Sequence, residues 1–294
     1  MIQFLPTTRN ELKALGWDRL DVILVTGDTY IDSPYIGVSV IGKVLVDAGY
    51  KVGIIAQPDT NSDADIGRLG EPSLFWGITA GCMDSMVSNY TATRKKRNDD
   101  DLTAGGRNTR RPDMAVIAYT NLVRRYFKNT KPIVIGGIEA SLRRISHYHY
   151  WNNKIRRSIL FDAKADILVY GMGEKTILEI SRKLRAGEDT RDIRGTCYIA
   201  KEKRADYLEL PAHNLVEKDK GQFTEMFKLF YANSDPLSGR GLYQKQDTRY
   251  LIQNPPQVNP TAAELDQIHE LDYENDVHPF YRSQGEVRAL DTIR

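Results

Sequence analysis

Short apolar runs alternate with amphipathic stretches over the first two thirds of the chain. Residues 36–48, for example, carry Val38, Ile41 and Leu45 at helical spacing, and Gly49 follows as a helix cap. Such alternation is typical of a parallel sheet with crossover helices. The pattern predicts five strands, at residues 21–26, 51–56, 75–80, 131–137 and 165–170.

Five βα units in a row predict a doubly wound α/β domain, whose ligands bind beyond the carboxyl ends of the strands. Two predicted turns at these ends are rich in glycine. Gly136 and Gly137 follow the fourth strand, and Gly171, Gly173 and Glu174 follow the fifth. The backbone can approach a ligand closely there, and helix N-termini donate N–H groups. The alternative is tight packing of helix on strand, with Glu174 as a first-turn carboxylate favoured by the helix dipole.

The pattern weakens after about residue 190. It predicts a strand at residues 196–201, an amphipathic helix at 215–232, a short strand at 250–253 and a helix at 261–271. We therefore expect an α/β domain over residues 1–190. Residues 191–294 are then an irregular α+β extension that acts as a connector.

The overall charge means that binding of nucleic acid or anionic lipid would need a local basic patch. The chain has 41 basic and 39 acidic residues, so no global field attracts nucleic acid or anionic lipid. The chain has no run of about 18 apolar residues, and its first residues lack the features of a signal peptide. We expect a cytoplasmic protein without a membrane span.

The cysteine count limits metal chemistry. Cys82 and Cys197 are the two cysteines of the chain, and they lie far apart in the sequence. Zinc and iron–sulfur sites need three or four ligands at close spacing, so these two thiols cannot build one. We expect both to be buried structural thiols, because free cysteine behaves as a small apolar residue.

Several segments resemble one known layout in order and spacing. Residues 133–141 are similar to the strand and Gly-Gly turn of cobalamin-binding domains fused to radical SAM enzymes, and residues 166–174 resemble the next strand, turn and helix start. Residues 278–281 and 290–294 resemble the lead into the radical SAM barrel, the latter as its opening strand. The remaining matches, to the YgiQ family of radical SAM proteins, lie at residues 4–8, 16–18, 27–34 and 142–157.

The resemblance to the YgiQ family covers the whole chain and implies a Rossmann-like, cobalamin-binding-like domain. It also implies a four-iron cluster and S-adenosylmethionine, which the family holds through a CxxxCxxC motif. In the family that motif comes shortly after the point where this chain ends. We therefore expect an amino-terminal portion without catalytic residues or metal ligands, inactive alone, whose partner is the radical SAM barrel. Packing against the barrel or gating of the substrate is its expected role.

The turn after the first strand bears on cobalamin. Cobalamin domains that ligate cobalt use Asp-x-His-x-x-Gly, in which the histidine binds the metal and the carboxylate fixes its tautomer. Here Asp32, Pro34 and Gly37 occupy these places, and proline has no lone pair for a metal. Asp32 and Gly37 stay candidate cofactor contacts, with an ordinary strand-to-helix turn as the alternative. Binding without a protein ligand to cobalt is left open.

A basic aromatic stretch is the candidate partner or substrate surface. Its composition suits the interface with the barrel, which we favour, or a stand-alone module that binds single-stranded nucleic acid or a nucleotide. Its candidate residues are Arg143, Arg144, His147, His149, Trp151, Arg156 and Arg157. His147 and His149 could touch one metal, but no third ligand is near them in the sequence.

A second charged run lies at residues 94–101, inside a polar stretch, 91–110, that we expect to be an exposed loop. Four basic residues are followed closely by three acidic ones, and most such runs are simply solvated. A lid over a substrate opening is the sharper hypothesis.

Overall fold

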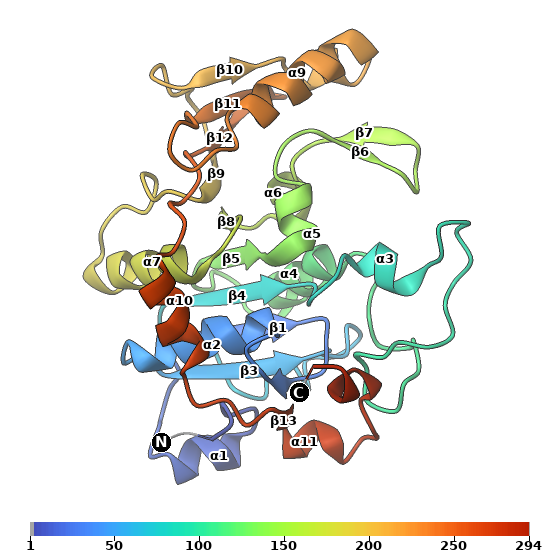
Figure 1. The fold of residues 1–294 in the computed structure, drawn as a ribbon, viewed down its shortest axis with the longest axis vertical. Coiled ribbons are helices and arrows are strands. Elements are labelled where there is room, and N and C mark those ends of the chain that lie inside the picture. The colour runs from blue at the N-terminus through green and yellow to red at the C-terminus, as the bar shows by residue number, and fades with distance from the viewer. Residues whose placement is uncertain (1–2, 294) are drawn as a thin grey trace. The chain divides into compact units, whose positions relative to one another are not determined.

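The computed structural model describes residues 3–293 and divides into two compact units (Figure 1). Unit 1 contains the residues up to Glu139 and those from Pro260 onward, and unit 2 is Ala140–Asn259. These units reflect packing in space, and the expected domains 1–190 and 191–294 stay a prediction. No helix within residues 3–293 is long and apolar enough to span a bilayer.

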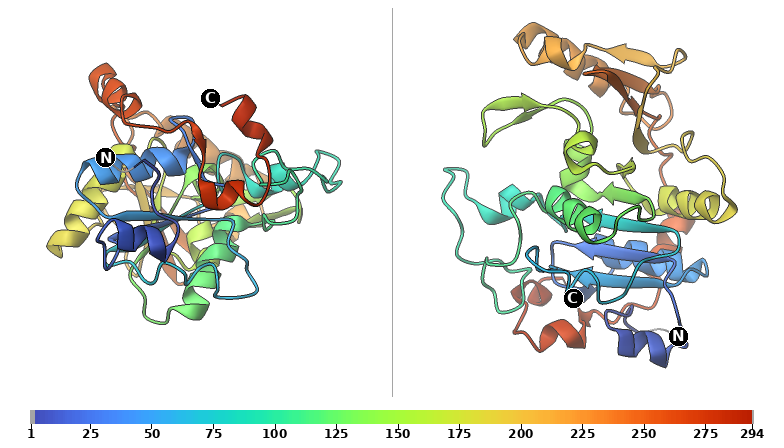
Figure 2. Two further views of the ribbon diagram at one scale, coloured as in Figure 1. Left: turned by 90° about the horizontal axis from the view of Figure 1, so that it is seen from below. Right: turned by 180° about the vertical axis from the view of Figure 1, so that it is seen from behind.

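Four parallel strands form the sheet of unit 1, in the order β3-β1-β4-β5. They are β1 (Val22–Thr26), β3 (Val52–Ala56), β4 (Phe75–Thr79) and β5 (Ile133–Gly136). All residues of β1 and β3 are buried, as expected for parallel strands covered on both faces. Helix α2 (Gly37–Asp47) lies on one face and helix α4 (Ala115–Tyr126) on the other (Figure 2). The predicted doubly wound parallel α/β fold is confirmed.

Shorter elements complete the amino-terminal part of unit 1. Helix α1 (Arg9–Ala14) begins with a capping box between Thr8 and Glu11, which satisfies the first N–H groups of the helix. Strand β2 (Ile31–Asp32) follows β1, and helix α3 (Ser85–Asn89) follows β4.

The last 35 residues return to unit 1. They form α10 (Ala262–His269), β13 (Asp276–Val277), α11 (Pro279–Arg282) and a 3-10 helix, η1 (Arg288–Asp291). Strand β13 pairs antiparallel with β2, and the Tyr281 hydroxyl accepts a hydrogen bond of 2.7 Å from the Ala56 N–H of edge strand β3. The predicted strand at residues 290–294 is wrong, because the buried Leu290 lies in η1; Arg294 is outside the described residues.

Unit 2 contains a mixed sheet in the order β10-β11-β12-β9-β8, in which only β10 and β11 are parallel neighbours. Its strands are β8 (Ile167–Val169), β9 (Thr196–Ala200), β10 (Leu208–Leu210), β11 (Leu242–Gln246) and β12 (Arg249–Gln253). Strand β8 is the fifth predicted strand, and β9 and β12 confirm the predictions at 196–201 and 250–253. The sequence pattern missed β10 and β11.

The helices of unit 2 are α6 (Ile159–Ala163), α7 (Glu174–Ala186), α8 (His213–Val216) and α9 (Lys220–Ala232). The helix predicted at 215–232 is therefore two helices. A separate hairpin pairs β6 (His147–His149) with β7 (Lys154–Arg156). Helix α5 (Gly137–Leu142) carries the chain from unit 1 into unit 2.

Candidate functional site at the carboxyl edge of unit 1

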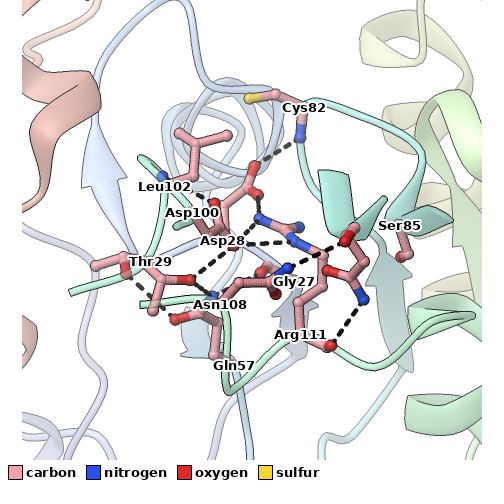
Figure 3. A network of polar contacts seen from close by, with 12 residues as sticks. Gly27, Asp28, Thr29, Gln57, Cys82, Ser85, Asp100, Leu102, Asn108 and Arg111 are labelled. Carbon is pink, nitrogen blue, oxygen red and sulfur yellow. Dashed lines mark hydrogen bonds and ion pairs between the residues drawn. The ribbon is translucent and has the colours of Figure 1, made fainter. Parts of the chain in front are cut away.

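The carboxyl ends of the strands in unit 1 are covered by residues 98–111, called the plug below. The plug is tied to the turn after β1, since Thr29 N–H donates to Leu102 O at 2.8 Å and Ala104 N–H donates to Thr29 Oγ1 at 3.0 Å (Figure 3). It is also tied to the end of β3, where Gln57 Nε2 donates to Thr103 Oγ1 at 2.6 Å. The plug thus lies where ligands of doubly wound domains usually bind.

A buried ion-pair cluster anchors the plug. Arg111 Nη2 lies 2.7 Å from Asp28 Oδ1 and 3.1 Å from Asp100 Oδ2, and Arg111 Nη1 donates to Ala80 O at 2.7 Å. Each of the three charged side chains is at most 4% exposed. Gly27 is required beside them, because a Cβ atom there would lie 2.2 Å from Ala80 O. The prediction that residues 91–110 form an exposed loop is right for residues 94–99. It is wrong for much of the plug, where many residues are buried or partly buried.

Two carboxylates share one guanidinium in this cluster, so the fully ionised cluster carries a net charge of −1. Burial raises the pKa of Asp28, and the positive charge of Arg111 opposes only part of that effect. The Asp28 carboxylate also accepts a hydrogen bond of 2.6 Å from Cys82 N–H. Asp28, Asp100 and Arg111 thus bind one another and hold the plug in place. None of the three is accessible from solvent, as a catalytic group would be.

Cys82 lies next to this cluster and is exposed, whereas Cys197 in unit 2 is fully buried. The prediction of two buried thiols is confirmed for Cys197 and wrong for Cys82, because residue 82 lies in the solvent-facing turn after β4. Although the residue is exposed, desolvation of its thiol by the surrounding protein atoms, followed by the nearby Asp28 carboxylate, raises the pKa of Cys82 to about 12. The thiol is therefore a weak nucleophile at neutral pH.

Glu139 is a further buried carboxylate that the sequence pattern did not single out. Its Oε2 accepts from Ser85 N–H at 2.9 Å and its Oε1 accepts from Val116 N–H at 3.0 Å. One side chain thereby satisfies backbone donors at the starts of α3 and α4, as capping groups do.

Among the predicted cofactor contacts of unit 1, Asp32 is fully buried. Its carboxylate accepts from Ser39 Oγ at 2.5 Å and from Glu274 N–H at 2.9 Å, and it pairs with Lys43 Nζ at 3.1 Å. Gly37 is the first residue of α2. These contacts give Asp32 a structural task; its role toward a cofactor stays a prediction.

The predicted glycine turns have different surroundings. Gly136 ends β5, and Gly137 has φ +77° with Thr79 Oγ1 2.4 Å from where a Cβ atom would lie, which matches the tight-packing alternative. In unit 2, Gly171 has φ +75° and open space around it, Gly173 is the N-cap of α7, and Glu174 is the first residue of that helix. Ligand binding at either turn stays a prediction.

The basic aromatic stretch is largely engaged within unit 2. Arg144 stacks between Tyr170 and Phe230, 4.6 and 4.4 Å from the ring centroids. Arg156 pairs with Asp162 at 2.7 Å, and Arg157 pairs with Asp247. The other candidate residues are Arg143, His147, His149 and Trp151, of which Arg143 and His149 are buried and His147 and Trp151 are partly buried.

The two histidines of the hairpin lie edge to face, with ring centroids 6.5 Å apart. Burial lowers the pKa of His147 to about 4, so its ring is neutral at physiological pH. Within the described part of the chain, no group of three or more histidine, cysteine or acidic side chains could hold a metal ion.

These features define a doubly wound α/β domain whose carboxyl edge is filled by its own loop, joined to a smaller mixed-sheet unit. The chain belongs to the family described as Radical SAM N-terminal, which matches residues 4–294. The resemblance to radical SAM proteins expected from the sequence is confirmed.

The similar proteins are longer than this chain. The chain is 55% identical to a UPF0313 protein of Fusobacterium nucleatum over 294 residues, which cover 100% of this chain and 52% of that protein. It is 52% identical to a UPF0313 protein of Thermotoga neapolitana, with 99% and 52% covered. The chain thus spans about half the length of the relatives it matches.

Two solved structures of the radical S-adenosylmethionine methyltransferase TsrM from Kitasatospora setae are also similar. One has tryptophan substrate and an S-adenosylmethionine analogue bound; it matches with a TM-score of 0.38 and 20% identity over 60% of this chain and 28% of that chain. The other has cobalamin and an iron–sulfur cluster bound; it matches with a TM-score of 0.38 and 21% identity, over 60% and 26%. Likenesses this weak carry no argument about ligands.

Proposed function

We propose that this chain is the amino-terminal domain of a radical SAM protein, and that the other half of the longer protein holds the iron–sulfur cluster and S-adenosylmethionine. The observation that carries the proposal is the cysteine count. A cluster that leaves one iron free for S-adenosylmethionine needs three thiolates, and the chain has two cysteines, of which Cys197 is fully buried. By itself the domain is inactive.

The domain then acts by packing against the radical SAM barrel and by gating access of the substrate. The plug supports a gating role, because it is a loop held over the strand ends by a few identifiable contacts and preceded by the exposed basic run 94–97. The residues do not fit cobalamin with a protein ligand to cobalt. Pro34 offers no donor, Asp32 is engaged by Ser39 and Lys43, and Arg111 fills the carboxyl edge.

Nucleic-acid binding by the basic aromatic stretch has less support. Free guanidinium groups at the surface carry such binding, and Arg144, Arg156 and Arg157 stack or pair within unit 2. A surface whose charges are already compensated gives little salt-dependent affinity for phosphates.

Co-expression tests the proposal. The chain is produced together with the remaining half of the Fusobacterium nucleatum relative, and each half is also produced alone. We expect the two halves to co-purify as a brown complex that contains iron and sulfide and cleaves S-adenosylmethionine. A colourless mixture in which the halves do not associate would refute the proposed function.

A further inference from the structure

Four large apolar side chains are exposed at the carboxyl edge of unit 1. They are Tyr35, Met83, Val87 and Ile138, with exposed fractions of 66%, 42%, 57% and 49%. They come from the turn before α2, the turn after β4, helix α3 and the start of α5. We call this set the apolar edge.

The elements that carry these four side chains lie close to one another. A Cβ atom on Gly137 would lie 3.8 Å from Gly81 O, so the start of α5, with Ile138, adjoins the turn that carries Met83. Glu139 accepts a hydrogen bond from the first N–H of α3, which brings Val87 to the same place. The backbone of Gly37, two residues after Tyr35, is close enough to the Cys82 thiol to influence its pKa.

Exposed apolar side chains grouped in this way are typical of interaction surfaces. The turn that carries Met83 is held in place, since Cys82 N–H donates to Asp28, which is itself paired with Arg111.

The carboxy-terminal end of the described chain indicates the partner. Ser33 Oγ donates a hydrogen bond of 3.1 Å to Ile293 O, and Ser33 lies two residues before Tyr35 in the same turn. The relatives are about twice as long as this chain, and the matching family is described as Radical SAM N-terminal, so under the proposed function the other half continues from beside the apolar edge. We propose that the apolar edge is the docking face for that second half of the protein, an inference that rests on the proposed function.

Hydroxyl-radical footprinting tests the docking face. The 294 residues are joined to the remaining half of the Fusobacterium nucleatum relative, and oxidation of each residue is compared with that in the 294-residue chain alone. If docking lowers the exposed fraction of Tyr35 from 66% to about 10%, its oxidation rate falls about sevenfold, and the oxidation rate of Met83 also falls. Leu237 of unit 2, at 88% exposed, serves as the reference and keeps its rate.

Substitutions make the test specific. Met83→Asp and Ile138→Asp should restore the Tyr35 oxidation rate in the fusion to about that of the chain alone, whereas Leu237→Asp should leave Tyr35 protected. All three sites are exposed, so thermal unfolding of the variants should match that of the parent chain.

The outcomes separate the two proposals. A fusion that binds a cluster and cleaves S-adenosylmethionine, yet leaves Tyr35 and Met83 fully reactive, would overturn the docking face and keep the proposed function. A fusion that binds no cluster would overturn the proposed function, and with it the docking face that rests on it. Protection of Leu237 alone would place the interface elsewhere and also overturn the docking face.

Discussion

The Arg111→Met substitution is the sharpest test of the buried cluster. Arg111 is the only cation that pairs with Asp28 and Asp100 among the ion pairs of the described residues, and its guanidinium also donates to Ala80 O. Methionine fills much of the same volume but leaves two carboxylates buried without their cation. Removing one partner of a buried ion pair typically lowers the free energy of unfolding by about 3–5 kcal/mol. We expect a loss of that size for unit 1 at pH 7.

Urea unfolding followed by tryptophan fluorescence measures this loss, because Trp76 of strand β4 is fully buried in unit 1. Limited trypsin digestion gives a second readout. Residues 94–97 are exposed and basic, and release of the plug should speed cleavage there.

The control removes all three charges at once, as Asp28→Asn, Asp100→Asn and Arg111→Met. Without unpaired carboxylates, this triple variant should lose clearly less stability than Arg111→Met alone. The single variant should also regain part of its stability as the pH falls and its carboxylates become protonated. A loss below about 1 kcal/mol for Arg111→Met would contradict the view that the cluster anchors the plug.

Three further predictions concern other sites. Burial would raise the pKa of Glu11, but hydrogen bonds, chiefly from His278, outweigh it and lower the pKa to about 2. The ionised Glu11 therefore stabilises the fold above pH 4.5, and this stabilisation is lost as the pH falls towards 2. Because Glu11 is 38% exposed, Glu11→Gln should lower the free energy of unfolding by only about 1 kcal/mol at pH 7, and urea melts at the acid end of a pH series should no longer distinguish the variant from the parent. Burial lowers the pKa of His147 to about 4, so the ring has no pH-dependent effect on stability above pH 6.5, and up to about 3 kcal/mol should be lost as the pH falls from 6.5 to 4, because the unfolded chain is protonated first; equal pH profiles for His147→Gln and the parent would refute this. Gly137→Ala should lower the melting temperature more than Gly171→Ala, because both glycines have positive φ but only Gly137 faces a nearby threonine Oγ1. The backbone strain of alanine at positive φ costs about 1–3 kcal/mol at either position. Equal losses of melting temperature in the two variants would contradict the close contact at Gly137.

Periodicity was sufficient to predict the core of the fold. Strands β1, β3, β4 and β5 are runs of apolar residues, and α2 repeats apolar residues at helical spacing, so each shows its burial directly in the sequence. Strand β11 was missed because Leu242–Gln246 contains two glutamines and a lysine. The buried Gln244 and Gln246 hydrogen-bond to each other and to Ser146, so their polar groups have partners inside the protein. The order of residues along the chain does not reveal these partners.

The candidate site was harder to predict than the fold. Asp100 and Arg111 lie in a polar stretch that resembles a solvated loop, and their burial depends on pairing with Asp28, more than 70 positions away from either residue. Cys82 was expected inside because most free cysteines are buried, but its place depends on a turn after β4. Long-range ion pairing and turn geometry are set by the tertiary fold, which periodicity alone does not reveal.

Anaerobic reconstitution of the isolated chain tests the central claim most directly. The purified 294 residues are incubated with iron, sulfide and S-adenosylmethionine, and bound iron and cofactor cleavage are measured. Because Cys82 and Cys197 cannot supply three thiolates, we predict no stable cluster and no cleavage. A full cluster bound per chain, with S-adenosylmethionine cleaved unaided, would contradict the assignment of that chemistry to the other half of the protein.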